Sequence, residues 1–429
     1  MNMIPVFKYP GPSEWEVILK RPELNTSDLH TAVEEILDAV RLNGDAAVKE
    51  YSKKFDKARL DTLLVPENEI FRASVQVQDD LKKSIETARK NIEKFHSVIS
   101  DFDKVVVTSP GIRCWQRTVP IEKVGLYIPG GKAPLVSTVL MLGVPAVMAG
   151  CKDIIICTPP DQNGHVHPAI LFTASILGIN RIFRVGGVQA IAAMAYGTES
   201  IPKVYKIFGP GNQYVNAAKQ LVGRETVAID LPAGPSELAV IADQSADPVF
   251  VAADLLSQAE HGDDSQVMLI TCYEHLISKV LKELADQVEN LPRKEIAKKT
   301  LLNSKVILLE DEESMVRLVN EYAPEHLIIN TVNNNELGMR IINAGSVFLG
   351  QYAPESAGDY ASGTNHTLPT NGAARAYSGV SVDSFQKKIS FQEISQYGLY
   401  NIRSAIINLA DAEGFTAHRN AVSLRLKNV

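Results

Sequence analysis

The chain of 429 residues contains only four cysteines, Cys114, Cys151, Cys157 and Cys272, and none of them forms a C-x-x-C pair. Cysteines this far apart argue against a disulfide framework and against a thiolate zinc site. A cysteine that attacks an aldehyde substrate is conceivable, but a buried structural role is the commoner one for a free cysteine. The cysteines therefore predict neither a disulfide-stabilised fold nor a sulfur-rich metal centre.

A membrane segment and a basic surface are also missing. The N-terminus MNMIPVFKYPGPSEW has no basic flank followed by a long apolar run, so we expect neither a signal peptide nor an anchor. The longest apolar stretch, 134–151, is interrupted by Ser137, Thr138 and Gly143 and predicts a buried helix. The formal charge is -7, with Lys and Arg scattered among acids, which disfavours nucleic acid binding. We expect a cytoplasmic protein.

The apolar pattern of the central part of the chain predicts two α/β domains. Short β-rich runs alternate with helical patterns over 120–236, and the same rhythm recurs over 237–370. Strands separated by helices imply parallel pairing with right-handed crossovers. The predicted fold class is therefore α/β, with two Rossmann-like open parallel-sheet domains of similar topology.

The two ends of the chain have a different character. Residues 1–119 predict a helical N-terminal segment, which we expect to pack on the second α/β domain. Residues 371–429 predict an extended arm followed by helices, a small tail domain. A tail of this length is too short to bury a good core alone, so a second subunit is the natural partner for it.

The most informative segment is 229–262, IDLPAGPSELAVIADQSADPVFVAADLLSQAEHG. Asp247 as a cap and Pro248 at the first position predict the start of a helix. Gln258 and His261 are three residues apart near its end, so both side chains leave one face and can converge on one ion. Glutamine is a weak zinc ligand, and a surface glutamine beside a capping histidine is the alternative.

A second candidate is the adjacent pair Glu325 and His326, which follows Pro324 and precedes the strand pattern LIIN. This order predicts a position at a sheet edge, where open α/β sheets bind ligands. An imidazole can act as a base near neutral pH, and a carboxylate can deprotonate water. The alternative is an ordinary turn with two polar residues.

Three further polar features are less specific. Asp359 lies in ESAGDYASGTNHTLPT, a composition that predicts a loop in which a carboxylate can reach a metal, or an Asx turn. His418 follows Thr416, a plausible helix cap, and a surface role is the alternative. The pair His165 and His167 has no acidic or thiol partner nearby, which favours a solvated loop.

A dinucleotide fingerprint of the form G-x-G-x-x-G is missing. Residues 209–214 are GPGNQY, with two of the three glycines between a predicted strand and a predicted helix. Without further information this pattern indicates a tight turn, although a pyrophosphate could still lie near the start of the following helix.

Several long blocks of the sequence resemble, in the same order, the histidinol dehydrogenases, zinc enzymes that finish histidine biosynthesis. The resemblance covers nearly the whole chain. Besides the segment ending in AEHG, the matching blocks are VGLYIPGG from Val124, RVGGVQAIAAMAYGT from Arg184, FGPGNQYVNAAK from Phe208, YAPEHL from Tyr322, GDYASGTNHTLPT from Gly358 and AEGFTAH from Ala412.

The resemblance implies a reaction and its cofactors. The family oxidises L-histidinol to L-histidine through L-histidinal with two NAD+, as a homodimer with one Zn2+ per subunit. It implies that 120–236 binds NAD, that 237–370 carries metal ligands, and that 371–429 mediates dimerisation and completes the site of the neighbouring subunit.

The resemblance also implies residue roles. His326 would be the base for the proton steps, and Glu325 would activate water. The four zinc ligands would be Gln258, His261, Asp359 and His418, the last from the partner. NAD+ would contact Tyr127, Gln189 and Asn212. The substrate would contact Ser236, Gln258, His261, His326, Asp359, Glu413 and His418. We expect His366 to lie behind the ligands or to be structural.

Three rival functions stay open at this point. A zinc hydrolase could use Glu325 as a base without any redox cofactor, and NADH formation would distinguish it. A related dehydrogenase could act on another amino alcohol or on a sulfonate-bearing alcohol. A binding protein without activity is disfavoured, because inactive relatives tend to lose some polar site residues.

Overall fold

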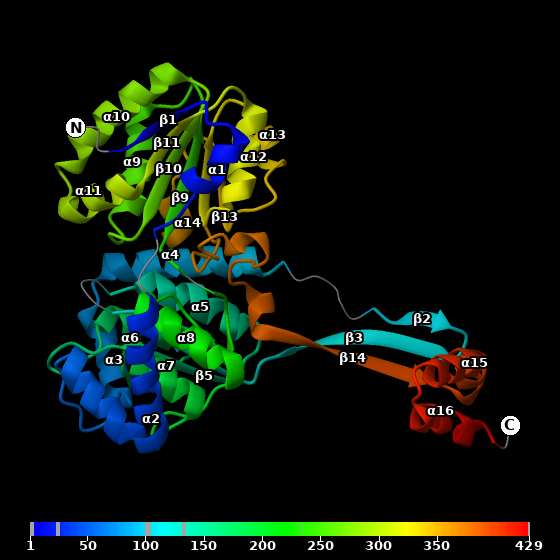
Figure 1. Cartoon of the computed structure of the whole chain (residues 1–429). Helices are drawn as coiled ribbons and strands as arrows, with labels where there is room; N and C mark the ends of the chain where they lie inside the picture. The colour runs from blue at the N-terminus through cyan, green and yellow to red at the C-terminus, as the bar shows by residue number, and fades with distance from the viewer. Residues whose placement is uncertain (1–3, 23–25, 99–103, 131–133, 233, 428–429) are drawn as a thin grey trace.

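The computed structural model describes residues 4–22, 26–98, 104–130, 134–232 and 234–427. Two α/β domains lie one above the other, and a long arm projects sideways from the first domain (Figure 1). Among these described residues, no helix combines the length and the apolar character needed to cross a bilayer. The prediction of two open parallel-sheet domains is confirmed.

The first domain is built on a five-stranded sheet in the order β6-β5-β4-β7-β8, and every pairing is parallel. Its first strand along the chain lies at the centre, which is the Rossmann arrangement. The strands are β4 (Lys123–Tyr127), β5 (Asp153–Thr158), β6 (Arg181–Arg184), β7 (Lys206–Phe208) and β8 (Ala228–Ile229). The helices are α5 (Val136–Met148) and α6 (Pro168–Ile176) on one face and α7 (Gly187–Tyr196) and α8 (Gln213–Glu225) on the other. The predicted buried helix is α5.

The second domain repeats this strand order and adds one N-terminal strand at its edge, giving β1-β11-β10-β9-β12-β13. All of its pairings are parallel too. The strands are β1 (Val6–Lys8), β9 (Glu237–Ala242), β10 (Gln266–Thr271), β11 (Lys305–Leu308), β12 (His326–Asn330) and β13 (Ser346–Leu349). The helices are α9 (Pro248–Ala259), α10 (Glu274–Val288), α11 (Lys294–Asn303), α12 (Glu312–Tyr322), α13 (Asn334–Gly338) and α14 (Glu355–Tyr360).

The N-terminal segment divides between the two domains. Strand β1 and α1 (Pro12–Ile18) belong to the second domain, where Trp15 enters the core. The three following helices pack on the first domain: α2 on α7 and α8, α3 on α6, and α4 on α5. The prediction that the whole segment packs on the second domain is therefore wrong for these helices, whose apolar faces complete the cores of the first domain. They are α2 (Thr26–Phe55), α3 (Glu67–Gln76) and α4 (Asp79–His96).

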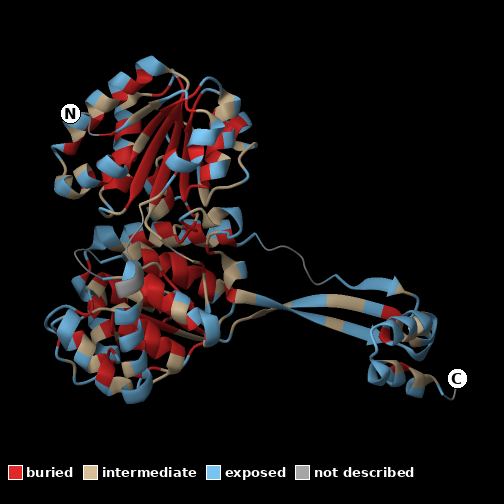
Figure 2. Ribbon diagram, viewed as in Figure 1, coloured by how far each residue is buried: buried red, intermediate tan, exposed pale blue. Residues whose placement is uncertain are grey.

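The projecting arm is a three-stranded antiparallel sheet with two helices at its far end (Figure 1). Its strands are β2 (Val106–Ser109), β3 (Ile112–Pro120) and β14 (Gln386–Ile394), and its helices are α15 (Gln396–Ala412) and α16 (Thr416–Ser423). The arm is therefore not purely C-terminal, and the segment 1–119 is not wholly helical, because β3 pairs with β14 along its full length. Most of the arm is exposed or half-buried, in contrast to the buried sheets of the two domains (Figure 2).

Short 3-10 helices complete the described chain between and after these elements. They are η1 (Ala373–Arg375), η2 (Val382–Phe385) and η3 (Leu424–Leu426). Phe385 at the end of η2 stacks on Phe208 of β7, with ring centroids 3.9 Å apart. This contact fixes the base of the arm to the first domain.

Candidate active site

The predicted catalytic pair lies at the amino edge of the second sheet. His326 is the first residue of β12, Glu325 directly precedes it, and Ser236 directly precedes the neighbouring strand β9. Open α/β sheets usually bind ligands at the carboxyl ends of their strands. The expectation of a site at the usual edge is therefore corrected: the opposite edge carries the pair. Helix α9 runs back after β9, so its end returns to this same edge.

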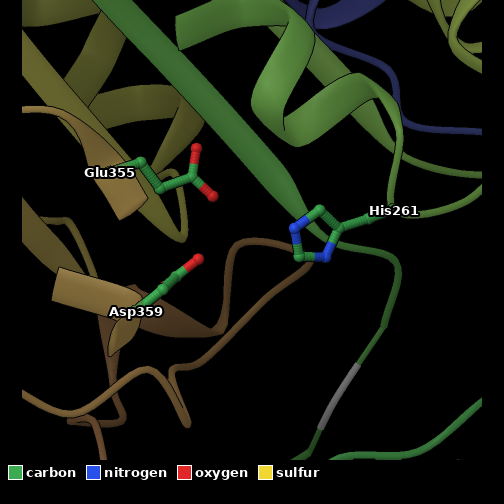
Figure 3. Close-up of side chains that lie close together, drawn as sticks. All are labelled: His261, Glu355 and Asp359. Carbon is green, nitrogen blue, oxygen red and sulfur yellow. The ribbon is translucent and has the colours of Figure 1, made fainter. Parts of the chain in front are cut away.

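A histidine and two carboxylates converge there. The ligand atoms of His261, Glu355 and Asp359 all lie within 4.8 Å of one another. Figure 3 shows both carboxylates directed toward the His261 ring, which comes from a different part of the chain. Asp359 does not lie in a loop, as its composition suggests, but on the short helix α14. Glu355 is one helical turn earlier, so the two carboxylates share a face.

Gln258, three residues before His261 near the end of α9, is a further candidate ligand. It is fully buried, and neither its amide oxygen nor its amide nitrogen has a hydrogen-bonding partner among the described residues. Helix α9 ends at Ala259, and the backbone N–H of His261 donates to the carbonyl of Gln258 over 3.2 Å. The cap Asp247 and the first residue Pro248 are confirmed at the start of this helix.

His326 is buried among three carboxylates. Its Nδ1 lies 3.7 Å from Glu325 Oε2 and 3.6 Å from Glu355 Oε1, and its Nε2 lies 3.6 Å from Asp359 Oδ1. The Glu325 Oε2 atom accepts a hydrogen bond from the backbone N–H of Glu237 at 2.9 Å. One imidazole is therefore the centre of a network that includes every acidic group of the site.

Two effects of opposite sign shift the pKa values of these groups. Burial favours the neutral form of each group, whereas attraction between the imidazole and the carboxylates favours the charged forms. Burial raises the pKa of Glu325 to about 8, and burial raises the pKa of Glu355 as well. Burial opposes charge on His326 too, but the surrounding carboxylates outweigh it and raise its pKa to about 10. Burial also acts against Asp359, whose pKa is nevertheless lowered by His326. His261 remains exposed on one side, yet desolvation by the surrounding protein outweighs the attraction of Asp359 and lowers its pKa, which favours the neutral, metal-binding form.

The cluster fits a divalent cation. Buried carboxylates and an unpartnered buried amide are costly unless a positive group satisfies them. A neutral imidazole, carboxylate oxygens and an amide oxygen form a mixed nitrogen and oxygen donor set, which suits a catalytic ion such as zinc. Gln258, His261, Glu355 and Asp359 are the residues that could hold it.

The three predicted cofactor residues meet at the carboxyl edge of the first sheet. Tyr127 ends β4, Gln189 lies in the first turn of α7, and Asn212 caps α8. All three line one cavity of about 1640 Å³. Gln189 is buried, and neither of its amide atoms has a hydrogen-bonding partner in the part of the chain that the structure describes. The Tyr127 hydroxyl accepts a hydrogen bond from the Gly187 N–H. Open parallel sheets of this order commonly bind ligands at this edge.

The GPGN turn at this edge is held by a buried ion pair. Gly209 has a φ of +133°, and a Cβ there would lie 2.1 Å from the Tyr127 carbonyl oxygen, so only glycine fits. The Nζ of Lys219 donates to the Gly209 carbonyl at 2.7 Å, and Asp230 accepts from the Gly209 N–H at 2.8 Å. Lys219 and Asp230 also pair with each other at 2.5 Å. The turn that presents Asn212 is thus fixed from both sides.

His366 connects the two edges. Its Nδ1 lies 3.0 Å from the Asp359 carbonyl, and its Nε2 lies 3.3 Å from the hydroxyl of Thr138 in the first turn of α5. The amide of the adjacent Asn365 donates to the Met141 carbonyl of the same helix at 2.6 Å. The amino edge of the second sheet therefore abuts the first domain, and His366 supports that junction beside Asp359.

Two predicted residues do not join the cluster within one chain. Glu413 follows α15, and His418 lies on α16, so both are exposed on the far end of the arm (Figure 1). Their proposed contribution to a neighbouring subunit stays a prediction. Of the histidine pair, His167 caps α6 through Nδ1, and His165 is exposed near Glu69.

Sequence reasoning missed Glu355. The signal that could have revealed it is the spacing Pro354, Glu355 and then Asp359, because proline favours a helix start and a spacing of four puts two carboxylates on one helical face. The Gly- and Ser-rich composition of this segment concealed the helix.

Two Rossmann-like domains with a cluster of buried titratable groups at their junction define a two-domain α/β enzyme. The model of the family described as histidinol dehydrogenase matches residues 19–426. A histidinol dehydrogenase of Bacteroides thetaiotaomicron is 60% identical over 427 residues, covering 100% of both chains. One of Salmonella typhimurium is 50% identical, covering 97% of this chain and 96% of its own length.

A solved structure agrees with these sequence relatives. The crystal structure of histidinol dehydrogenase from Elizabethkingia anophelis superposes with a TM-score of 0.97 and 52% identity, covering 100% of this chain and 99% of that one. The chain belongs to the histidinol dehydrogenase family and is an NAD-dependent oxidoreductase.

Proposed function

We propose that this enzyme oxidises L-histidinol to L-histidine through L-histidinal, with Zn2+ and two NAD+, as the last step of histidine biosynthesis in the cytoplasm. The observation that carries the proposal is the convergence of His261, Glu355 and Asp359 beside the buried pair Glu325 and His326. Relatives named for this activity are 60% identical over the full chain.

Gln258, His261 and Asp359 would hold the metal, and Glu355 adds a fourth donor from the same chain. When bound, the ion would supply open coordination positions that fix the imidazole and amino nitrogens of the substrate, and positive charge that lowers neighbouring pKa values. This positive charge matters because the surrounding carboxylates alone raise the pKa of His326 to about 10, which would keep the imidazole protonated at neutral pH.

Neutral His326 can take the hydroxyl proton of the alcohol at its Nε2 or Nδ1 while the carbinol hydride leaves to NAD+. The product of this half-reaction is the aldehyde. Glu325 then removes a proton from the water that adds to the aldehyde carbon, and the hydrate loses the second hydride to a second NAD+. Burial of both side chains excludes other water from the aldehyde.

We propose that Tyr127, Gln189 and Asn212 bind NAD+ in the cavity of the first domain. The amide of Gln189, which has no partner among the described residues, and the amide nitrogen of Asn212, whose oxygen caps α8, are suitable hydrogen-bonding groups for a polar cofactor. Ser236, directly before β9, would contact the substrate from the amino edge of the second sheet.

The test is an assay of zinc-loaded protein with histidinol and NAD+, counting NADH formed per histidinol consumed. We expect two NADH per substrate, loss of activity with a chelator, and recovery with added zinc. Consumption of substrate without NADH would instead indicate the hydrolase alternative. A panel of other amino alcohols and of sulfonate-bearing alcohols tests substrate identity, and a preferred substrate other than histidinol would overturn it.

We also propose that the enzyme is a homodimer in which Glu413 and His418 of each arm enter the site of the other subunit. The arm supports this, because apolar side chains on it remain exposed in the single chain: Ile389, Ile394, Tyr397, Tyr400, Leu409, Phe415 and Leu424. Exposed apolar surface of this extent is typical of a subunit interface.

Mixed dimers test the shared site. Chains carrying His418→Ala and chains carrying His261→Ala are each expected to be inactive, and co-expressing them should restore part of the activity through dimers with one intact site. Purification with two different affinity tags isolates the mixed species. An inactive mixed dimer would show that each site is built within one chain.

A further inference from the structure

The side chain of Arg21 reaches the amino edge of the second sheet from the N-terminal segment. Its Nε lies 2.5 Å from Glu237 Oε1, and its Nη2 donates to Glu237 Oε2 at 2.8 Å. The Glu237 side chain is only 2% exposed and that of Arg21 17%. This is a two-pronged, largely buried ion pair, a geometry that arginine forms and lysine does not.

The same guanidinium also holds the end of α12. Its Nη2 donates to the carbonyl of Tyr322 at 2.7 Å, and its central carbon lies 4.0 Å from the centroid of the Tyr322 ring. Tyr322 is itself buried, and its hydroxyl donates to Gln266 Oε1 at 2.9 Å. Arg21 therefore joins the start of β9 to the last residue of α12.

The segment after α12 carries the proposed catalytic pair, and the start of β9 contacts it. The backbone N–H of Glu237 donates to Glu325, and the Glu237 carbonyl lies 3.3 Å from His326 Nδ1. Tyr322 is followed by Ala323, which has a φ of +53°, then by Pro324 and the pair itself. A non-glycine residue held in the left-handed region persists only where its surroundings enforce it. The contact of Arg21 with Tyr322 is one such constraint.

We propose that Arg21 and Glu237 are positioning residues for Glu325 and His326. Neither side chain faces the substrate. Arg21 fixes the carboxylate of Glu237, and the Glu237 backbone in turn orients both catalytic side chains. The hydrogen bond and ring contact of Arg21 with Tyr322 fix the position at which β12 begins. The inference rests on the proposed function, because it assigns a purpose to the same pair. A displacement of about 1 Å in such a pair can cost about 100-fold in rate.

The decisive variant is Arg21→Lys, which keeps the positive charge but cannot form both bonds to Glu237 and stack on Tyr322. We expect a fall in kcat of about 10- to 100-fold for histidinol and for added histidinal alike. The KM for NAD+ should stay within about twofold and the zinc content should not change, because Arg21 touches neither the cofactor cavity nor the metal cluster. Arg89→Lys on α4 is the matched control, since Arg89 is also partly buried and ion-paired, with Glu86 and Glu93.

Chemical rescue separates positioning from general stability. In Arg21→Ala the space of the guanidinium is open, so guanidinium ion added at concentrations well below those that unfold the protein should raise kcat several-fold, while urea at the same concentration should not. Melting temperatures recorded under the same conditions show whether stability changes in parallel.

If the wild type is active and Arg21→Lys has the same kcat, the inference is overturned. The same holds if Arg21→Lys has a lower melting temperature but an unchanged kcat. A rise in the KM for NAD+ alone would also overturn it. Failure of the wild type to oxidise histidinol would instead refute the proposed function, so the two failures are distinguishable.

Discussion

The two α/β domains have the same strand order, but their proposed functional residues lie at opposite edges of the two sheets. In the first domain, Tyr127, Gln189 and Asn212 lie at the carboxyl ends of the strands, as the Rossmann arrangement predicts. In the second, Glu325 and His326 lie at the amino ends. The comparison shows that topology alone does not decide which edge becomes functional.

Local features explain the difference. In the first domain the turn between β7 and α8 lies at the carboxyl edge, where Gly209 allows close approach of the backbone to Tyr127. The second domain uses the end of α9 and the starts of β9 and β12, all of which lie at the edge that abuts the first domain through His366. The amino edge of the second sheet therefore lies against the first domain.

We propose that the first domain binds the cofactor and the second binds the metal. Among the variants that test this separation, His261→Ala should have the largest effect on activity. Loss of the histidine from the metal cluster should remove bound metal and reduce activity by about 1000-fold or more, because metal chemistry contributes several kcal/mol. Elemental analysis and NADH formation measure the two effects. His275→Ala, an exposed histidine on α10 of the same domain, is the control. Stoichiometric metal in the variant would show that His261 is not a ligand.

A smaller effect is expected from Glu325→Gln. Removing the proposed base for water should slow the oxidation of added histidinal by about 100-fold and the first hydride transfer from histidinol much less. Single-turnover formation of NADH from each substrate separates the two steps, with Glu321→Gln, exposed on α12, as the control. Equal slowing of both steps would refute the assignment of Glu325 to water activation.

Gln189→Ala tests the first domain alone. Because the amide of Gln189 has no partner within the described protein, its loss should weaken NAD+ binding and raise the KM for NAD+ about tenfold, the value of one or two hydrogen bonds. The zinc content and the KM for histidinol should not change. Gln220→Ala, exposed on α8, is the control. A changed metal content would contradict a separate cofactor domain.

The smallest effect concerns the wall of the cofactor cavity. Burial raises the pKa of Asp56 to about 6, so the folded state binds this proton more tightly than the unfolded chain does. The resulting contribution to stability is present below the unfolded pKa, near 4, and is lost as the pH rises through 6. Asp56→Asn should therefore be more stable than the wild type at pH 7.5 by about 1 kcal/mol, allowing for solvent screening.

Urea unfolding of both proteins without NAD+ measures this difference, which should vanish near pH 4. A variant that is less stable than the wild type at pH 7.5 would mean that the Asp56 carboxylate has a favourable partner in the folded protein.

The sequence predicts the parallel-sheet domains well, because alternating apolar runs and helical patterns are local signals. It fails for the packing of α2, α3 and α4, since an amphipathic helix shows which face is buried but not against which domain. The sequence also does not reveal that the proposed catalytic pair lies at the amino edge of the second sheet. Finding it requires the strand order, which places β12 beside β9, together with the return of α9.

The candidate site was only partly visible in the sequence. The sequence pattern predicts Gln258 and His261 on one helical face, but α9 ends at Ala259, so only Gln258 lies on the helix and His261 follows it. The segment that carries Glu355 and Asp359 has the composition of a loop, so the sequence reveals neither helix α14 nor the Glu355 carboxylate beside Asp359. The roles of Glu237 and Arg21 depend on contacts between residues more than 200 positions apart, 216 in this pair, and no local pattern predicts such contacts.

The pairing of β3 with β14 joins Ile112 to Ile394. During synthesis β3 therefore leaves the ribosome long before its main partner exists, and it stays an unprotected edge until nearly the whole chain has been made. We expect the arm to be among the last parts of the molecule to fold. Truncated chains that end before β14 should aggregate through this edge, even where the parallel sheets of both domains are complete.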